Sequence, residues 1–291
     1  MGPWSRPDAR SIPGLSPLRR FMPALLPQRN GAVVYFEQIV PVQALQAFID
    51  ARNAERPADA PPIKLFAVLV TALAHTLTLR PTLNRYVAGG KLWQRDAISV
   101  GYVVKKAMAD SAKMTTVRMT LPEPPTLDAV TALMAAQQRI GRGDAPLTSE
   151  KEMAVVTRLP MPLLRGLMAL QRLLDGWGLL PAMMTRDDPL YASVMCANLG
   201  SVGLDAGFHH LFEYGTTPLF LTIGRVHRAP IVDDAGAVVA ADVVKLCWSY
   251  DERIADGFYA ARSLETFSAL LREPERLLRA PEPGPGHEAR G

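Results

Sequence analysis

The chain has 291 residues, of which 48% are hydrophobic and 21% are charged, and its formal net charge is +4. This composition predicts a folded protein of one large domain or two small ones and excludes a disordered chain. Because the sequence has no long basic run, a nucleic-acid partner is excluded as well, whereas an anionic small-molecule ligand is compatible with the weak positive charge.

The first 15 residues are rich in Pro, Gly and Arg and predict a loose arm. Residues 32–40 are rich in β-branched and aromatic side chains and predict a strand. Residues 42–53 have helical apolar spacing, and residues 63–79 predict a nearly all-apolar helix that ends before Pro81. Such a helix should be buried on most sides.

Further strands are predicted over residues 93–104, 114–121, 192–197, 219–226 and 238–249. Helices are predicted over residues 127–140 and 258–271, and the Pro-rich residues 280–291 predict a disordered tail. Helices and strands are mixed without regular βαβ alternation, so the expected fold class is α+β.

Two cysteines, Cys196 and Cys247, lie in apolar runs, which favours reduced, buried thiols and a cytoplasmic protein. The N-terminus has no apolar signal segment. Charged and polar residues interrupt the longest apolar stretch, 161–184, so a transmembrane helix is not expected. Neither the cysteines nor the histidines have ligand spacing, so no metal site is predicted.

Residues 248–257 read Trp-Ser-Tyr-Asp-Glu-Arg-Ile-Ala-Asp-Gly. This segment resembles the D-H-R-x-x-D-G signature of dihydrolipoyl acyltransferases, the catalytic cores of 2-oxoacid dehydrogenase complexes. It also resembles the H-H-x-x-x-D-G of chloramphenicol acetyltransferases. In both families the His removes a proton from a thiol or hydroxyl that attacks a CoA thioester.

Four more segments follow the same order as in these families. Residues 15–20 resemble the opening S-x-x-R-K/R helix, 80–84 the H-P-x-L-N, 197–203 the I-S-N-L-G-x-x-G and 218–225 the A-A-I-L-G-V-G-R strand. The resemblance implies a chloramphenicol acetyltransferase-like two-layer sandwich with a mixed sheet. It would span residues 16–279, with a helical insert at about 158–186.

Both catalytic side chains of these families are replaced. Glu252 stands in place of the His, and Ala197 in place of the Ser or Thr that donates to the oxyanion of the intermediate. The family's T-P-R-G-L is absent, and residues 105–111 stand there. Free-standing bacterial relatives with a similar N-L-G-S-x-G…D-E-R-I-x-D-G usually have Glu, so Glu252 is interpreted as a subfamily feature.

A buried carboxylate can act as a general base, so Glu252 is the first candidate for that role. The alternative is that Glu252 only pairs with Arg253. The resemblance implies that Asp256 holds the loop by pairing with an Arg near the start of the chain, Arg20 first and Arg19 second. Gly257 would permit a close approach or a turn into the next helix.

Other residues could replace the missing groups. Asn198 and Ser201 are candidate oxyanion donors, or they stabilise a turn. His209 and His210 are candidate bases, or they serve packing. Lys105 and Lys106 could contact CoA phosphates, or they are ordinary surface lysines. Each of these six residues therefore has both a chemical and a structural interpretation.

In the insert, one helix face consists of Leu163, Leu167, Leu170 and Leu174, with arginines opposite. It could be a packing helix, a lid over a long acyl chain near Glu252, or, through residues 161–184, a peripheral contact with a membrane.

The leading hypothesis is an acyl-CoA-dependent acyltransferase that moves an acyl group between CoA and a thiol or hydroxyl acceptor. CoA would be a substrate, with no permanently bound cofactor. The resemblance implies a homotrimer with its sites between subunits, formed through residues 29–40 and 191–203. The alternative is a non-catalytic relative that binds CoA thioesters or serves as a scaffold. Since no lipoyl or subunit-binding module is visible, we expect it to work outside a 2-oxoacid dehydrogenase complex.

Overall fold

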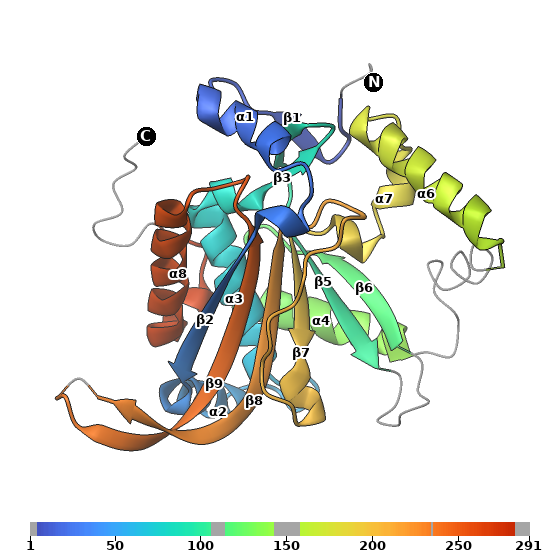
Figure 1. The fold of residues 1–291 in the computed structure, drawn as a ribbon. Coiled ribbons are helices and arrows are strands. Elements are labelled where there is room, and N and C mark those ends of the chain that lie inside the picture. Colours follow the sequence, from blue (N-terminus) through green and yellow to red (C-terminus); the bar gives the residue numbers. More distant parts are fainter. Residues whose placement is uncertain (1–4, 106–113, 143–157, 234, 283–291) are drawn as a thin grey trace.

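A mixed sheet of six strands, in the order β2-β9-β8-β7-β5-β6, forms the centre of the computed structural model (Figure 1). The structure describes residues 5–105, 114–142, 158–233 and 235–282. The strands are β2 (Val33–Pro41), β5 (Ser99–Lys105), β6 (Met114–Thr120), β7 (Val194–Asn198), β8 (Leu219–Val232) and β9 (Val238–Asp251). The β5–β7 and β7–β8 pairs are parallel, and the other pairs are antiparallel.

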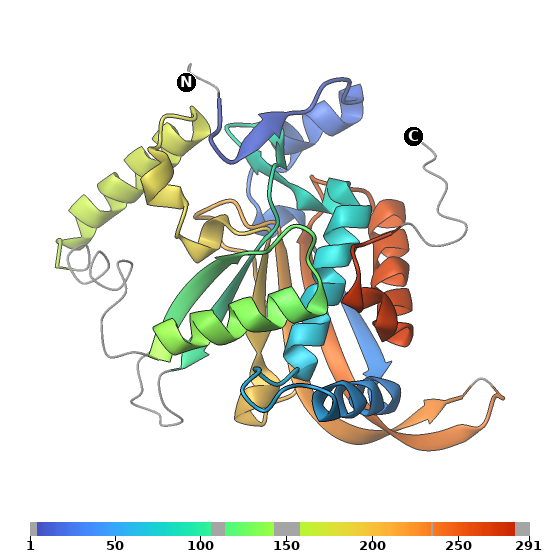
Figure 2. The ribbon, with the colours of Figure 1, turned by 180° about the vertical axis from the view of Figure 1, so that it is seen from behind.

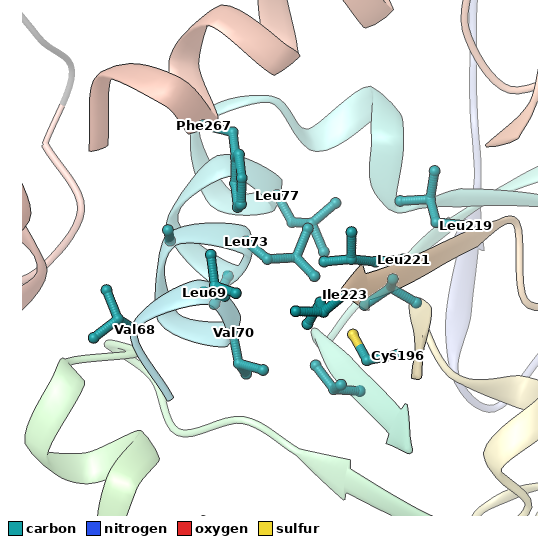
Figure 3. Packing of buried hydrophobic residues seen from close by; sticks show 14 of the residues in the cluster. Val68, Leu69, Val70, Leu73, Leu77, Cys196, Leu219, Leu221, Ile223 and Phe267 are labelled. Atoms are coloured by element: carbon teal, nitrogen blue, oxygen red, sulfur yellow. The ribbon is translucent and has the colours of Figure 1, made fainter. Parts of the chain in front are cut away.

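Helices cover one face of this sheet (Figure 2). They are α2 (Gln43–Ala54), α3 (Leu65–Leu79), α4 (Leu127–Arg142) and α8 (Gly257–Arg272). Every residue of α3 from Ala67 to Leu77 is buried, as its apolar sequence predicts. Its leucines pack against β8 and Cys196 of β7 on one side and Phe267 of α8 on another (Figure 3). The expected two-layer α+β sandwich with a mixed sheet is confirmed.

The opposite side of the sheet, here called the open face, is defined by strand alternation. On β8, Leu219, Leu221 and Ile223 belong to the helix-side core, whereas Phe220 packs with Met195 on the other side. Residues 208–212 lie across this open face through contacts with Phe220 and a hydrogen bond from Ser249. The two faces therefore have separate cores.

A second, small sheet has the order β1-β4-β3, with β1 (Ala9–Ser11), β3 (Arg85–Ala88) and β4 (Lys91–Arg95). The loose arm predicted for residues 1–15 is therefore wrong at β1. Asp8 fixes this segment because it accepts hydrogen bonds from Arg95 Nη1 at 2.9 Å and Tyr86 Oη at 2.9 Å. The single strand predicted over 93–104 is likewise two strands, β4 and β5, in different sheets.

The remaining elements are short or peripheral. The helix α1 (Pro17–Leu25) begins after Ser16, whose hydroxyl accepts from the Arg19 amide. The predicted insert contains α6 (Met161–Gly176) and α7 (Ala182–Thr185). The 3-10 helices are η1 (Asn30–Ala32), η2 (Pro81–Asn84), η3 (Pro189–Tyr191), η4 (Leu199–Val202) and η5 (Pro274–Leu278).

The strands β8 and β9 are longer than predicted and extend beyond the sheet as a two-stranded ribbon (Figure 1). Most of the predicted C-terminal tail, residues 283–291, lies outside the described residues. Over the described ranges, every helix is too short or too polar to cross a bilayer.

Candidate functional site

The loop after β9 is organised by a buried ion pair. Asp251 is completely buried and accepts from Arg253 through Nε at 2.8 Å and Nη2 at 2.7 Å. The Arg253 amide donates to the same carboxylate at 3.1 Å, and its Nη1 donates to the carbonyl O of Leu26 at 3.0 Å. This bidentate arrangement fixes the loop geometry, and Arg253 therefore has a structural position in the loop.

A second arginine, Arg29, lies on the other side of Asp251 and was missed by the sequence analysis. Its Nε is 3.8 Å from Asp251 Oδ2, and its Nη2 donates to the Gly215 carbonyl at 2.9 Å. Burial lowers the pKa of Arg29, and the Asp251 carboxylate opposes that shift. No sequence motif marks Arg29, because its partners are carbonyl groups and a carboxylate far along the chain.

Asp256 pairs with Arg19, not with Arg20. Arg19 Nη2 lies 3.6 Å from Asp256 Oδ2, and its Nη1 donates to the Glu252 carbonyl at 2.9 Å. Arg20 is exposed, because consecutive residues of a helix point about 100° apart. The loop-holding role expected for Asp256 is observed, and its Oδ1 also caps α8 by accepting from the Tyr259 amide at 2.8 Å.

Gly257 is the first residue of α8. A Cβ atom added there would meet no other atom within 4 Å, and its φ is not in the left-handed region. Of the two roles predicted for Gly257, the close approach is not observed, and the residue lies at the turn into α8.

Glu252 is held by its backbone, while its carboxylate is not engaged. The Glu252 amide donates to the Ala32 carbonyl at 2.9 Å, and its side chain is partly buried. In the described part of the chain, its carboxylate has no hydrogen-bond or ion-pair partner. Since Arg253 is bound by Asp251, the alternative in which Glu252 pairs with Arg253 is not observed.

Asn198 and Ser201 form a turn at the end of β7. Ser201 Oγ donates to the Asn198 carbonyl at 2.7 Å, and the Ser201 amide donates to Asn198 Oδ1 at 3.3 Å. A Cβ on Gly200 would lie 2.5 Å from the Gly224 carbonyl O, which explains the Leu-Gly of this motif. The turn-stabilising alternative for Asn198 and Ser201 is thus the one observed.

This turn borders a hollow of about 160 Å³ at the start of α3. Its walls include Phe66, Asn198, Ser201 and Arg225. Lys105 ends β5, which is parallel to β7, so its backbone reaches the same end of the sheet. Lys106 lies outside the described residues.

The two halves of the expected site are far apart in one chain. On the open face, Ala197 of β7 pairs with Thr222 of β8, and Thr222 pairs with Cys247 of β9. Asp251 is four residues further along β9, about 14 Å at the usual strand rise. One chain therefore does not bring Glu252 to Ala197, whereas two neighbouring chains could.

Sequence comparison adds independent support to the motifs. Residues 185–279 match the model of the 2-oxoacid dehydrogenases acyltransferase catalytic domain. A dihydrolipoyllysine-residue acetyltransferase component of the pyruvate dehydrogenase complex from Staphylococcus aureus is 35% identical over 95 residues, or 33% of this chain. The resemblance to this acyltransferase family is confirmed. The match spans 21% of that relative's own length.

The family's fold extends over most of the chain. A probable dihydrolipoamide acetyltransferase from Listeria monocytogenes has a TM-score of 0.60 at 15% identity, covering 91% of this chain and 94% of that chain. A chloramphenicol acetyltransferase has a TM-score of 0.55 at 12% identity, covering 90% and 99%. At these identities the acyltransferase structures show the common fold, and the chemistry depends on this chain's own residues.

The two adjacent histidines lie on the open face of the acyltransferase-like sheet. The His209 ring stacks on Phe220 with centroids 4.0 Å apart, and its carbonyl accepts from Ser249 Oγ. His210 is exposed and stacks on His209 at 4.4 Å. The packing role of the pair is observed, and because both rings lie on the open face, both also stay candidate bases.

Both cysteines are free and buried, as expected. Burial raises the pKa of Cys196 to about 12 and also raises the pKa of Cys247. Neither thiol is therefore an activated nucleophile.

The helix α6 is attached mainly near its C-terminal end. Asp175 accepts from Arg6 Nη2 at 2.7 Å, and Gln171 donates to Tyr214 Oη at 2.9 Å. Both ribbon views place α6 on the opposite side of the molecule from α8, which follows Glu252 (Figures 1 and 2). The structure gives no support to a lid over Glu252 of the same chain.

The remaining roles of α6 are packing and membrane contact. None of its residues is buried, and Leu163, Leu167 and Leu170 are 57%, 40% and 51% exposed. Its exposed charges, Arg165 and Arg172, are positive, while its one acid is turned inward to Arg6. An exposed apolar stripe with arginines favours an anionic lipid surface.

We expect the full chain to sediment with phosphatidylglycerol vesicles and much less with phosphatidylcholine vesicles. Leu167→Asp with Leu170→Asp should weaken this binding by about 10²-fold or more, because burying two leucine side chains contributes about 3 kcal/mol or more. Val232→Asp, at a more exposed apolar position on the ribbon, is the control. Failure of the wild type to bind anionic vesicles at low salt would leave only the packing role.

Proposed function

We propose that this chain is an acyl-CoA-dependent acyltransferase in which Glu252 is the general base. The observation that supports the proposal most strongly is that the residues around Glu252 are ion-paired while the Glu252 carboxylate, in the described part of the chain, is not. The ion pairs of Asp251 and Asp256 fix the backbone around Glu252, yet its own carboxylate is without a partner among the described residues. A loop held this tightly around an unpaired carboxylate fits a catalytic role better than a decayed site.

In the proposed reaction, Glu252 takes the proton from a thiol or hydroxyl of the acceptor. The acceptor atom then attacks the thioester carbonyl, and the carbonyl oxygen becomes an oxyanion. Collapse of this tetrahedral intermediate breaks the carbon–sulfur bond and releases the CoA thiolate, which takes the proton from Glu252. CoA is thus a substrate, and no bound cofactor is required.

The alternative is a non-catalytic relative that binds CoA thioesters or serves as a scaffold. The replacement of both family groups, by Glu252 and Ala197, favours this alternative. Binding alone would not need a base, so the two functions differ in what they predict for Glu252.

Binding of CoA or acyl-CoA is expected of both the acyltransferase and the CoA-thioester binder, so a binding assay distinguishes these two functions from an unrelated one. We expect CoA and acyl-CoAs of increasing chain length to raise the melting temperature. At a ligand concentration one hundred times the dissociation constant, binding should stabilise the folded chain by about 3 kcal/mol. Acetyl transfer from acetyl-CoA to a small dithiol, followed as release of free CoA, then distinguishes the enzyme from the binder. Absence of any thermal shift across the series would contradict both the acyltransferase and the CoA-thioester binder, and would leave only the scaffold.

We also propose a homotrimer in which Glu252 of one chain faces the Ala197–Asn198 strand of the next. The segments expected at the interface expose apolar side chains, including Tyr35, Ile39 and Val202, which are 43%, 58% and 47% exposed. A similar fold, with a TM-score of 0.59 over 90% of this chain, forms the cubic core of a pyruvate dehydrogenase complex. Exposed apolar patches of this kind mark association surfaces.

Light scattering at micromolar concentration should therefore give three times the chain mass of 31.7 kDa. Ile39→Glu should lower this mass, because it places a charge in an apolar interface. The same change on the ribbon, Val232→Glu, is the control and should not. A monomer mass for the wild type would reject the trimer.

A further inference from the structure

A hydroxyl group lies beside the position where the family's hydroxyl is missing. Ala197 and Thr222 are register partners on the parallel strands β7 and β8. Both side chains point to the open face, because their neighbours Cys196, Leu221 and Ile223 belong to the helix-side core. Side chains paired in this way start from strands about 4.8 Å apart.

The Thr222 hydroxyl has no hydrogen-bond partner within the described part of the chain. Thr222 is 2% exposed, and its Oγ1 is buried without a hydrogen bond among the described residues. A buried hydroxyl normally has a partner, and leaving it unpaired costs roughly 1–3 kcal/mol. Valine would fill the same space on a strand without that cost, so the hydroxyl needs an explanation other than packing.

A comparison with the family's sequence segments also pairs the missing hydroxyl at position 197 with a hydroxyl at position 222. Residues 218–225 resemble A-A-I-L-G-V-G-R, in which Gly stands where this chain has Thr222. Ala197 stands where the family has Ser or Thr. A hydroxyl is therefore absent on β7 and present at the paired position of β8.

We propose that Thr222 supplies the oxyanion donor of this acyltransferase in place of the residue replaced by Ala197. This inference rests on the function proposed above and names a further residue of the same site. Ala197 is partly buried, and its methyl group is smaller than the Ser or Thr side chain that it replaces. Of the competing residues, Ser201 already donates its hydroxyl to the Asn198 carbonyl, and the Asn198 side chain is held in the turn because its Oδ1 accepts from the Ser201 amide.

The Thr222 hydroxyl would donate a hydrogen bond to the carbonyl oxygen as negative charge develops there. No bond to Thr222 forms or breaks, and the charge leaves with the CoA thiolate. A donor that is shielded from water and not engaged elsewhere is most effective for this purpose.

The test uses three variants of the full chain in acyl transfer from acetyl-CoA to a dithiol. Thr222→Val, which keeps the shape, should lower kcat by about 10²-fold and leave KM nearly unchanged. Thr222→Ser keeps the hydroxyl and should remain active. Thr222→Val combined with Ala197→Ser moves the hydroxyl to β7 and should regain most of the rate. Thermal unfolding of each variant shows that the fold is kept.

Full kcat in Thr222→Val would overturn the inference and leave the proposed function intact. Equal losses in Thr222→Val and Thr222→Ser would also overturn it, since packing would then explain both. A double variant as slow as Thr222→Val would contradict the exchange of the hydroxyl between strands. An inactive wild type would remove the proposed function, and this inference with it.

Discussion

Replacing Glu252 with Gln should lower the acyl-transfer rate by about 10²- to 10⁴-fold, the usual contribution of a general base. Gln keeps the shape of the side chain and removes the proton acceptor. The backbone contacts of residue 252 with Ala32 and Arg19 do not involve the carboxylate, so the fold should be unaffected. Steady-state transfer from acetyl-CoA measures the loss, and the thermal shift with CoA should remain close to that of the wild type.

The matched control is Glu265→Gln, an exposed carboxylate in an ion pair with Arg262 on α8. It should leave both the rate and the melting temperature within error, because exposed pairs contribute little. Full activity in Glu252→Gln would instead assign Glu252 a structural role. The base would then be sought at His209 and His210, whose rings lie on the open face.

Asp251→Ala should destabilise the chain by about 3–5 kcal/mol, the cost of leaving a buried charge without its partner. Asp251 is completely buried between Arg253 and Arg29, and its removal leaves two buried guanidinium groups without their shared carboxylate. Urea unfolding followed by circular dichroism measures this change. Because the loop carries Glu252, transfer activity should fall along with stability.

Asp128→Ala is the control for this change. Asp128 also pairs with an arginine, Arg56, but its side chain is 53% exposed. Its loss should therefore cost less than about 1 kcal/mol. A cost for Asp251→Ala as small as that of the control would show that the buried ion pair does not hold the loop.

Local patterns predicted most of the fold because they depend on neighbours in sequence. The apolar run of residues 65–79 predicts burial on most sides, and the structure places it between the sheet and the other helices. The strand β1 was missed because its pairing depends on Asp8, whose partners Tyr86 and Arg95 are distant in the chain. Contacts of this kind leave no local pattern.

The sequence motifs predicted which segments form the site, but they did not predict which side chains pair with each other there. The motif indicated that an early arginine meets Asp256, but only the phase of α1 decides between Arg19 and Arg20. Likewise, sequence spacing could not decide whether Arg253 binds Asp251 or Glu252. The register that places Thr222 beside Ala197 was invisible for the same reason, since nothing within either strand specifies its partner.

The most direct test of a shared site combines two inactive chains in one trimer. One chain carries Glu252→Gln, and the other carries Ala197→Leu, which fills the space that faces Glu252. Each is expected to be inactive alone, with a melting temperature close to that of the wild type. Co-expression with two different affinity tags allows the mixed trimers to be purified.

In mixed trimers, some interfaces combine Glu252 of one chain with Ala197 of the other. Every mixed trimer, whether it contains two chains of one variant or two of the other, has one such interface among its three, so the purified mixed trimers should regain about one third of the wild-type rate. Recovery of this size is the predicted result. Mixed trimers as inactive as the two parents would contradict a site that is shared between chains.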